Sequence, residues 1–326
     1  MPIVVNTNAS ATEASFNLSR ASEQLRKSLA RLSSGDRITR PAEDAGGLAV
    51  AYKLDSHAKR TEAVLNNHQN ALSYLQLQDG ALQTVGSVVS RMAELRTMAA
   101  DVTKNSSDIE NYSKEFRELQ AQLKQMSLEK FNGISLFAVN STSPAASDPI
   151  TAATSIWTDP ESGTSYSFTK VARELLTHPS GVSTDGSISL NVINLEFMVS
   201  VGTLSGTGSQ TNVNLMGQGN TIGNGVNSEG FVTNIGDIAI SMFTSVIQRV
   251  ADARAENGAE QQRVQASYNL HSQNLVNLEK ARGRIMDTDM ALESTRFARY
   301  NVLVQASASM TAQANQLTNV ALTLLQ

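Results

Sequence analysis

The sequence contains no cysteine among its 326 residues. Disulfides, thiolate catalysis and cysteine-bound metals are therefore excluded. Aromatic residues make up only 5% of the chain, and the net charge of −4 gives no general electrostatic reason to bind nucleic acid. Long hydrophobic runs are also lacking, so no membrane span is expected. The N-terminal residues have neither the basic nor the apolar region of a secretory signal peptide, so we expect any export to use another route.

Composition divides the chain into three parts. Residues 1 to about 138 and about 237 to 326 are rich in Ala, Leu, Gln, Ser and Glu, whereas the middle holds four of the six prolines. Alternating residues in SISLNVINLEFMVSV (187–201) indicate strands separated by turns. The sequence predicts two helical ends that flank a β-rich insert.

Apolar residues in both helical ends recur at spacings of three and four. The stripe of the last helix contains Leu303, Ala306, Met310, Gln313, Leu317, Val320 and Leu324. The first helix offers Leu18, Leu25, Leu29 and Leu32, and a further stripe runs from Leu65 to Val102. A stripe of this period lies along one face of a helix and packs against another helix. We therefore predict that the first and last helices pair with each other.

Charged residues are missing from both ends of the chain. None follows Arg299, and the first after Met1 is Glu13. A surface helix of a monomer usually carries charge on its exposed face, whereas neutral polar residues suit burial on several sides. A membrane-surface helix would need Lys or Arg on its polar face. Because a lone helix of this length is marginal in water, we predict that copies of the same chain cover these ends.

Catalytic and metal-binding patterns are not found. The four histidines are His57, His68, His178 and His271. None has metal-ligand spacing, and His68 and His271 lie beside apolar stripes, so we expect them to pack between helices. DTD (287–289) suits helix capping better than calcium binding, and MGQGNTIGNG (216–225) lacks the spacing of a phosphate-binding loop. We predict a protein that is not an enzyme and needs no cofactor or metal.

Several motifs at the two ends match a known family. From about residue 5 to 136 they are LARLSSGDRITRPAEDAGGLAVA, NHQNALSYLQLQDGALQTVGSVVSRMAELRTMA and KFNGISLF. From about residue 238 to 326 they are NLEKARGRIMDTDMALESTRFAR and QASASMTAQANQLTNVALTLLQ. In these segments, roughly two-thirds of the chain, the sequence resembles bacterial flagellin.

The resemblance implies a mainly α fold, a long antiparallel helical coiled-coil bundle formed by both termini, with a β-rich outer insert. Residues 1–43 with 286–326 would form the inner tube of a filament, 44–138 with 237–285 a helical shell, and 139–236 a variable surface domain. The protein would self-polymerise into the extracellular flagellar filament for motility. Its further partners would be an export chaperone at the C-terminal helix, the filament cap and junction proteins. Export would occur unfolded, through the flagellar type III system and without a cleaved signal peptide.

The resemblance also suggests roles for particular residues. SSGDRITRPAEDAGG (33–47) looks like a connector between inner tube and shell, and we hypothesise that its charges pair within and between subunits and set their register. The residues expected to carry self-assembly are Leu18, Leu25, Leu29, Leu32, Arg37, Arg40, Asp44, Leu303, Met310, Leu317, Val320 and Leu324. The Toll-like receptor surface of some flagellins maps onto SRMAELRTM (90–98), where Arg91, Glu94 and Leu95 match the pattern.

Three alternatives stay open at this stage. A hook–filament junction protein shares the terminal motifs but forms a short ring. An enzyme could carry its active site in the insert. A secreted translocator would insert into membranes. The combination of "LSSG", "FNG" and "AQANQ" favours flagellin over the junction protein.

Overall fold

The computed structural model describes residues 8–138, 150–158, 165–202, 213–217, 220 and 225–324. These residues divide into a terminal unit (1–59 and 274–326) and a central unit (60–273). Helices α2 (Ala45–Ala99) and α5 (Ile240–Met286) contribute residues to both units. The fold is mainly helical with a small strand-containing middle region, as predicted. The division into three filament layers with limits at 43/44, 138/139, 236/237 and 285/286 stays a prediction.

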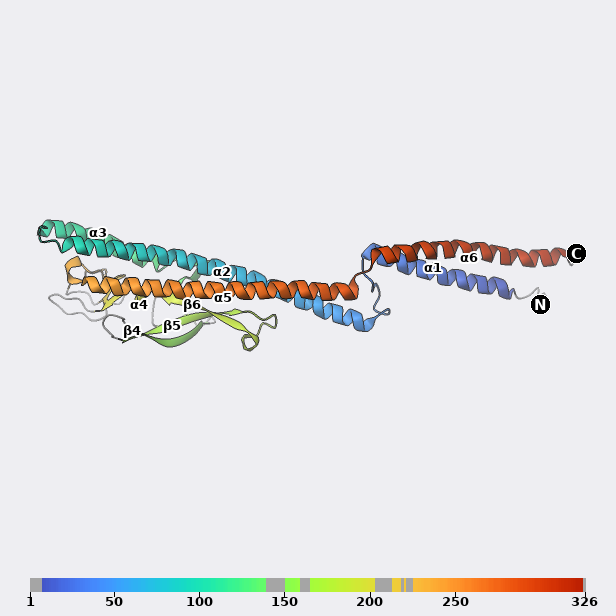
Figure 1. Ribbon diagram of the computed structural model, residues 1–326, viewed down its shortest axis with the longest axis horizontal. Coiled ribbons are helices and arrows are strands. Elements are labelled where there is room, and N and C mark those ends of the chain that lie inside the picture. The colour runs from blue at the N-terminus through green and yellow to red at the C-terminus, as the bar shows by residue number, and fades with distance from the viewer. Residues whose placement is uncertain are drawn as a thin grey trace. The chain divides into compact units, whose positions relative to one another are not determined.

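Two paired helices make up most of the terminal unit. Helices α1 (Ala9–Ser34) and α6 (Met290–Leu324) run side by side, with both chain termini at the same end of the pair (Figure 1). The Asn8 side chain caps α1 by accepting a hydrogen bond from the Ala11 backbone N–H at 3.0 Å. Gly35 ends α1 with a φ of 76°, a left-handed conformation that glycine adopts without steric cost.

The start of α6 is fixed by a side-chain cap. The Asp289 carboxylate accepts hydrogen bonds from the backbone N–H groups of Ala291 and Leu292, both at 3.0 Å. The capping role predicted for the DTD segment is therefore confirmed for Asp289. A negative charge at this position also suits the positive end of the helix dipole.

The central unit is built around a core shared by three helices. Helix α3 (Ser106–Met126) begins at Asn105, whose side chain accepts from the Asp108 N–H while the Asp108 carboxylate accepts from the Asn105 N–H. The rings of Phe116 on α3 and Phe243 on α5 meet edge to face at 6.2 Å. From α2 the core contains Leu75, Leu82, Val85, Val89 and Met92, all without solvent exposure.

One predicted member of the α2 stripe is wrong. Val102 is fully exposed, because α2 ends at Ala99 and Val102 lies in the turn before α3. The stripe indicated the right face but not the end of the helix. The turn is instead held by Asp101, whose carboxylate accepts hydrogen bonds from the Thr103 N–H and hydroxyl.

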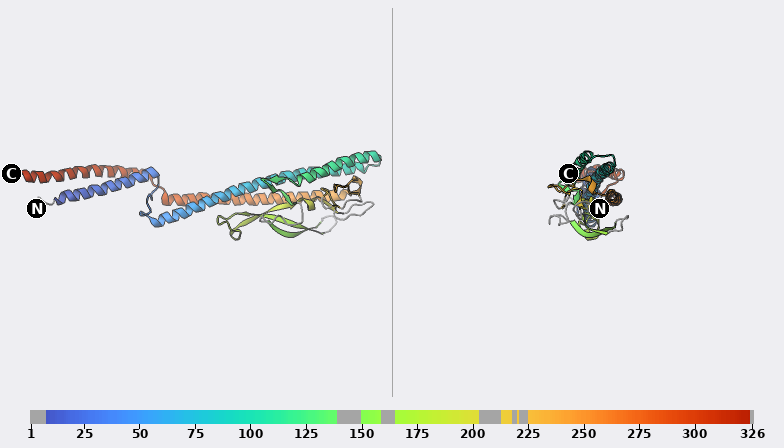
Figure 2. Two further views of the ribbon diagram at one scale, coloured as in Figure 1. Left: turned by 180° about the vertical axis from the view of Figure 1, so that it is seen from behind. Right: turned by 90° about the vertical axis from the view of Figure 1, so that its left-hand side faces the viewer.

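The described residues between α3 and α5 form three small sheets. Their strands are β1 (Lys130–Phe131), β2 (Ile134–Ser135), β3 (Phe137–Ala138), β4 (Ile150–Thr158), β5 (Ser165–Leu176), β6 (Ser187–Asn194), β7 (Ser200–Gly202) and β8 (Val213–Asn214). The largest sheet has the order β3-β6-β5-β4, in which β3 and β6 are parallel and the other pairs are antiparallel. In Figures 1 and 2, β4, β5 and β6 lie along one side of α5.

Asn132 and Gly133 form a tight turn. Both residues have positive φ, 49° and 81°, in the two-residue connection between β1 and β2. The run 187–201 is interrupted, since a single helical turn, α4 (Leu195–Met198), separates β6 from β7. The Asn194 side chain caps that turn by accepting from the Phe197 N–H.

Buried polar side chains attach the insert to the helices. Gln120 of α3 both donates to the Val232 carbonyl and accepts from the Val232 N–H, each at 3.0 Å. Arg249 of α5 donates to the Phe197 carbonyl and to the Ser200 hydroxyl. Because buried polar groups are costly when unpaired, these bonds fix the insert at one place along α3 and one along α5.

Glu260 of α5 makes a further contact with the insert. Both of its carboxylate oxygens accept from the Asn191 backbone N–H of β6, at 3.1 and 3.0 Å. Burial is the main cause that raises the pKa of Glu260 to about 7. Between the ordinary pKa near 4.5 and this value, the folded state holds a proton that the unfolded state has lost. Stability contributed by this group therefore falls as pH rises through that window.

We predict that Glu260→Gln stabilises the central unit by about 1–2 kcal/mol at pH 8, a figure reduced for partial solvent screening. The gain should vanish near pH 4.5, where the native carboxyl is already protonated. Urea unfolding followed by circular dichroism at both pH values measures the difference. Glu118→Gln, an exposed change on α3, serves as the control. An equal gain from Glu260→Gln at both pH values would contradict the prediction.

Among the described residues, no helix is long and apolar enough to cross a membrane.

Candidate functional site

The contact between α1 and α6 follows one stripe on each helix, which we call the inner seam. On α1 it contains Ala11, Ala14, Leu18, Ala21, Leu25, Ser28 and Leu32, and on α6 Glu293, Phe297, Tyr300, Val304, Ser307, Thr311 and Ala314. Spacings alternate between three and four on both helices, the pattern of an antiparallel coiled coil. Every α6 residue from 290 to 316 that is at least partly buried belongs to this seam.

Two polar contacts fix the pairing of the helices. The Asn8 side-chain amide donates to the Ala314 carbonyl at 2.8 Å, and the Ser28 hydroxyl donates to Glu293 Oε1 at 2.6 Å. Ser28 and Glu293 are 1% and 3% exposed. The contacts lie near opposite ends of the described seam, so α1 and α6 are antiparallel and hold a single register.

A second apolar stripe of α6 is left uncovered. This outer stripe contains Leu303, Ala306, Met310 and Gln313. Leu303 is 43% and Met310 64% exposed. It is the stripe that the sequence indicated for pairing, but the seam uses the neighbouring positions 304, 307, 311 and 314 instead. The outer stripe therefore faces away from α1 and is available to another helix.

The predicted leucines of α1 also separate into two groups. Leu18, Leu25 and Leu32 are half-buried in the inner seam, whereas Leu29 is 54% exposed outside it. Phe16 is 61% exposed on the same helix and was not singled out from the sequence. For Leu317, Val320 and Leu324, the helix backbone is described but the side chains lie outside the described part of the structure.

Exposed apolar side chains of this size gather on both terminal helices. On α6 they also include Met290, Leu292 and Val302, each at least half exposed. Burying one such side chain contributes about 1.5–3 kcal/mol, and large exposed apolar surfaces mark interaction sites. The terminal unit therefore has surface that a single copy of the chain leaves in contact with water.

The connector between α1 and α2 is held by ion pairs and backbone contacts. Glu43 accepts from Lys27 at 3.1 Å and from Arg31 at 3.0 Å. Arg37 donates to the Ile285 carbonyl at 2.9 Å and lies 3.6 Å from the Asp44 carboxylate. These contacts lie within one chain. They join the connector to the last turns of α5.

The predicted connector charges therefore have different surroundings. Asp44 caps α2 by accepting from the Gly47 N–H at 2.7 Å, in addition to its pairing with Arg37. Arg40 is exposed and contributes its carbonyl to a turn with the Glu43 N–H. Arg37 and Asp44 thus have a role inside the chain, while a role of Arg40 between subunits stays a prediction.

Burial tends to raise the pKa of Glu43, but hydrogen bonds from Arg31 and Lys27 outweigh it and lower the pKa below 4.5. A depressed pKa in the folded state means that this contact stabilises at neutral pH and loses its effect as pH falls through the folded value.

We predict that Glu43→Gln lowers the free energy of unfolding of the terminal unit by about 0.5–1 kcal/mol at pH 7. At acid pH, below the lowered pKa of Glu43 in the folded state, the loss should disappear because the carboxyl is protonated in both states. Thermal unfolding followed by circular dichroism measures both values, and the exposed Glu23→Gln on α1 is the matched control. A loss of equal size at acid pH would argue against the charge as its cause.

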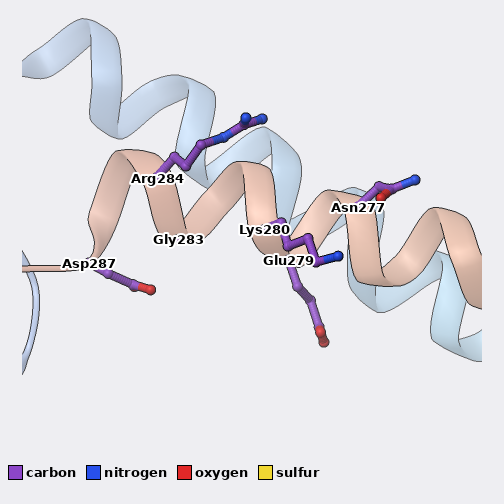
Figure 3. A pocket seen from close by; sticks show the side chains of 6 residues that line it. All are labelled: Asn277, Glu279, Lys280, Gly283, Arg284 and Asp287. Carbon is purple, nitrogen blue, oxygen red and sulfur yellow. The ribbon is translucent and has the colours of Figure 1, made fainter.

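A charged hollow lies on the last turns of α5 and has a volume of about 880 Å³. It is lined by Asn277, Glu279, Lys280, Gly283, Arg284 and Asp287. Figure 3 shows that these side chains diverge, with Arg284 pointing to one side and Asp287 to the other. They do not converge on a common point as ligands of a substrate or metal would. Within the described residues, no group of three or more metal-ligating side chains is found.

The histidines expected to pack between helices do so. His68 is fully buried on α2 with its Nδ1 2.7 Å from the Val64 carbonyl and its Nε2 2.9 Å from the Ser267 hydroxyl of α5. Its ring centroid lies 5.5 Å from that of His271. Both rings are therefore part of the contact between α2 and α5.

The segment matched to a receptor surface lies near the end of α2. Arg91 is paired with Glu115 at 2.8 Å and with Glu94 at 3.1 Å, and all three side chains are exposed. Leu95 is fully buried in the core. Only Arg91 and Glu94 of the predicted residues therefore offer side chains to a partner, and receptor recognition stays a prediction.

Sequence reasoning missed the polar residues of the inner seam. Ser28 and Glu293 fall at seam positions normally filled by apolar residues, so a search for apolar periodicity passes over them. A signal was available, because Ser28 and Glu293 continue the alternating three-four spacing of their helices.

Together, these features define a class of protein: a mainly helical chain whose paired terminal helices leave a second apolar stripe exposed to other molecules. The description rests on the two stripes of α6, one buried against α1 and one exposed. It also rests on the other apolar side chains that α1 and α6 leave exposed.

Comparisons with known proteins give the family. A family model of the bacterial flagellin N-terminal helical region matches residues 5–142, and one of the C-terminal helical region matches residues 240–325. Flagellin A of Vibrio cholerae is 29% identical, with both chains covered completely. Flagellin of Bacillus subtilis is 27% identical, with 96% of each chain covered. A solved structure of a flagellar hook-associated protein from Vibrio parahaemolyticus shares the fold, with a TM-score of 0.53, 15% identity, and 75% of this chain and 100% of that one covered.

The chain belongs to the bacterial flagellin family. It is a structural subunit of the flagellar filament, and nothing in the comparisons favours the hook–filament junction alternative.

Proposed function

We propose that the outer stripe of α6 and the exposed residues of α1 are the surfaces through which subunits polymerise. The observation that carries this proposal is the position of Leu303 and Met310, which lie on a continuous apolar stripe that faces away from α1. Each α6 then contacts α1 of its own chain through the inner seam and a neighbouring subunit through the outer stripe. In the sequence, Leu317, Val320 and Leu324 continue the three-four spacing of this stripe, and we propose that they take part in the same contact.

The lack of charge beyond Arg299 supports the same assignment. Beyond Arg299, the residues of α6 outside the two stripes are neutral, so they can be buried by further neighbours without the cost of desolvating a charge. This suits the innermost layer of a tube, in which a helix is surrounded by other helices.

We predict that Met310→Glu raises the critical concentration for polymerisation by about 100-fold or more, because it removes a buried apolar contact and places a charge in the interface. Sedimentation after a heat-and-cool cycle measures the polymer. Met310→Leu keeps the apolar contact at the same position and should polymerise as the parent does. Unchanged assembly of Met310→Glu would show that the outer stripe lies outside the subunit contacts.

Removal of residues 300–326 tests the wider assignment. The truncated chain loses most of the inner seam and the whole outer stripe, so it should stay in the supernatant at every concentration. Circular dichroism should show that the central unit remains folded, since its core does not include these residues. Pelletable fibres formed by the truncated chain would disprove the proposed role of α6.

The connector charges are proposed to act at two levels. Arg37 holds the connector against α5 within the subunit, so Arg37→Glu should reduce both its stability and its assembly. Arg40 is exposed, so Arg40→Glu should leave the unfolding of the subunit unchanged and alter only filament assembly or shape. Electron microscopy of the polymers together with thermal unfolding separates these two effects. Normal filaments and normal swimming with Arg40→Glu would exclude a role for that charge between subunits.

The remaining partners follow from the family. We propose that an export chaperone covers α6 before assembly and that the cap and junction proteins contact the subunit. We also propose export in an unfolded state without a cleaved signal peptide, and no catalytic role. An exposed apolar stripe that must not polymerise inside the cell supports the chaperone. N-terminal sequencing of filament subunits should begin at Met1 or Pro2, and a later start would indicate a cleaved leader.

A further inference from the structure

The inner seam contains one buried carboxylate. Glu293 is 3% exposed, and Ser28, which donates a hydrogen bond to it at 2.6 Å, is 1% exposed. The rest of the seam consists of apolar, small or neutral polar side chains. A buried ionisable group between two helices is expensive unless it is paired, and single polar groups of this kind are known to specify the register of coiled coils.

The other partners of Glu293 lie on its own helix. Arg296, three residues later, is 3.3 Å from the second carboxylate oxygen, and the carboxylate lies in the first turn of α6, where the helix dipole favours a negative charge. Both contributions stay the same wherever α1 lies along α6. Ser28 is the partner of Glu293 that depends on the position of α1.

The apolar pattern alone does not select this position. Ser28 pairs with Glu293 and Asn8 with Ala314, so paired positions add up to 321 or 322 along the seam. If α1 moves by one heptad, Ala11 faces Val304 instead of Thr311, and Ala14 faces Tyr300. The alternation of three and four is preserved, and the layers that remain still consist of apolar and small side chains, such as Leu18 opposite Phe297. Layer for layer, burial of apolar surface therefore discriminates weakly between the two registers.

The carboxylate discriminates between them. In the shifted pairing Glu293 would face Ala21, which has no side-chain donor, while Ser28 would lie beyond the start of α6. The carboxylate would then be buried without its hydrogen bond from α1, a state that is costly in a low-dielectric contact.

We propose that the hydrogen bond from Ser28 to Glu293 locks the register of α1 against α6. The hydrogen bond thereby determines which apolar side chains α1 and α6 bury against each other and which they expose to other subunits. The two residues act as positioning residues, because neither belongs to the outer stripe.

The absence of native cysteine allows a direct test in the full-length chain. Ala11→Cys with Thr311→Cys marks the observed register, and Ala11→Cys with Val304→Cys marks the register shifted by one heptad. Intramolecular disulfide closure under a mild oxidant is followed by the mobility of the monomer on a denaturing gel. With Ser28 and Glu293 present, the first pair should close about tenfold faster or more, the ratio that a preference of 1.4 kcal/mol produces.

Three substitutions then separate the hydrogen bond from the charge. Glu293→Gln keeps an acceptor for the Ser28 hydroxyl and should retain the preference. Glu293→Leu and Ser28→Ala remove the hydrogen bond in different ways. Both should reduce the ratio of the two disulfide closure rates to about threefold or less. Circular dichroism confirms that the helices are still present in each variant.

The outcomes are decisive in either direction. Retention of the full preference by both Glu293→Leu and Ser28→Ala would overturn the proposal, as would equal closure of the two cysteine pairs in the parent. Loss of the preference in Glu293→Gln as well would show that the charge, and not the hydrogen bond, sets the register. Because disulfide closure occurs within one chain, the test is independent of polymerisation through the outer stripe.

Discussion

A pair of helices can cover only one face of each helix. In the terminal unit this limit has a clear effect, because α6 carries two neighbouring stripes and α1 occupies one of them. Leu303 and Met310 stay exposed for that reason, and so do Phe16 and Leu29 on α1. A monomer can bury these side chains only by giving up the inner seam. Copies of the chain can bury them while the seam stays intact, which connects the local packing of two helices to the formation of a polymer.

The central unit has a large core of its own. Core residues on α2, α3 and α5 are buried, and the insert is attached by polar contacts such as those of Gln120 and Arg249. Some apolar side chains of this unit, such as Leu128 and Leu270, are nevertheless exposed. The chain thus combines a central unit with a buried core and a terminal unit that consists mainly of one pair of helices.

Much of the helical framework could be predicted from apolar periodicity, including the buried face of α2 around Leu75. Errors occurred where local signals compete. Val102 continues the α2 stripe but follows the end of the helix, and the helical turn at Leu195 interrupts an alternating run that reads as strand. On α6 the period was recognised but the wrong one of two adjacent stripes was assigned to α1, since hydrophobicity alone favours Leu303 and Met310 over Ser307 and Thr311.

The sequence by itself determined that the chain has two helical ends, a strand-rich middle and no cysteine chemistry, because composition and periodicity are properties of the chain alone. Its uncharged C-terminal segment already indicated burial by neighbours. Only the tertiary structure decided which stripe of α6 faces α1, and it did so through contacts between residues some 265 positions apart, Ser28 and Glu293. A search for apolar periodicity passes over such a contact, since its energy depends on two polar groups that become close and dehydrated only when the helices meet.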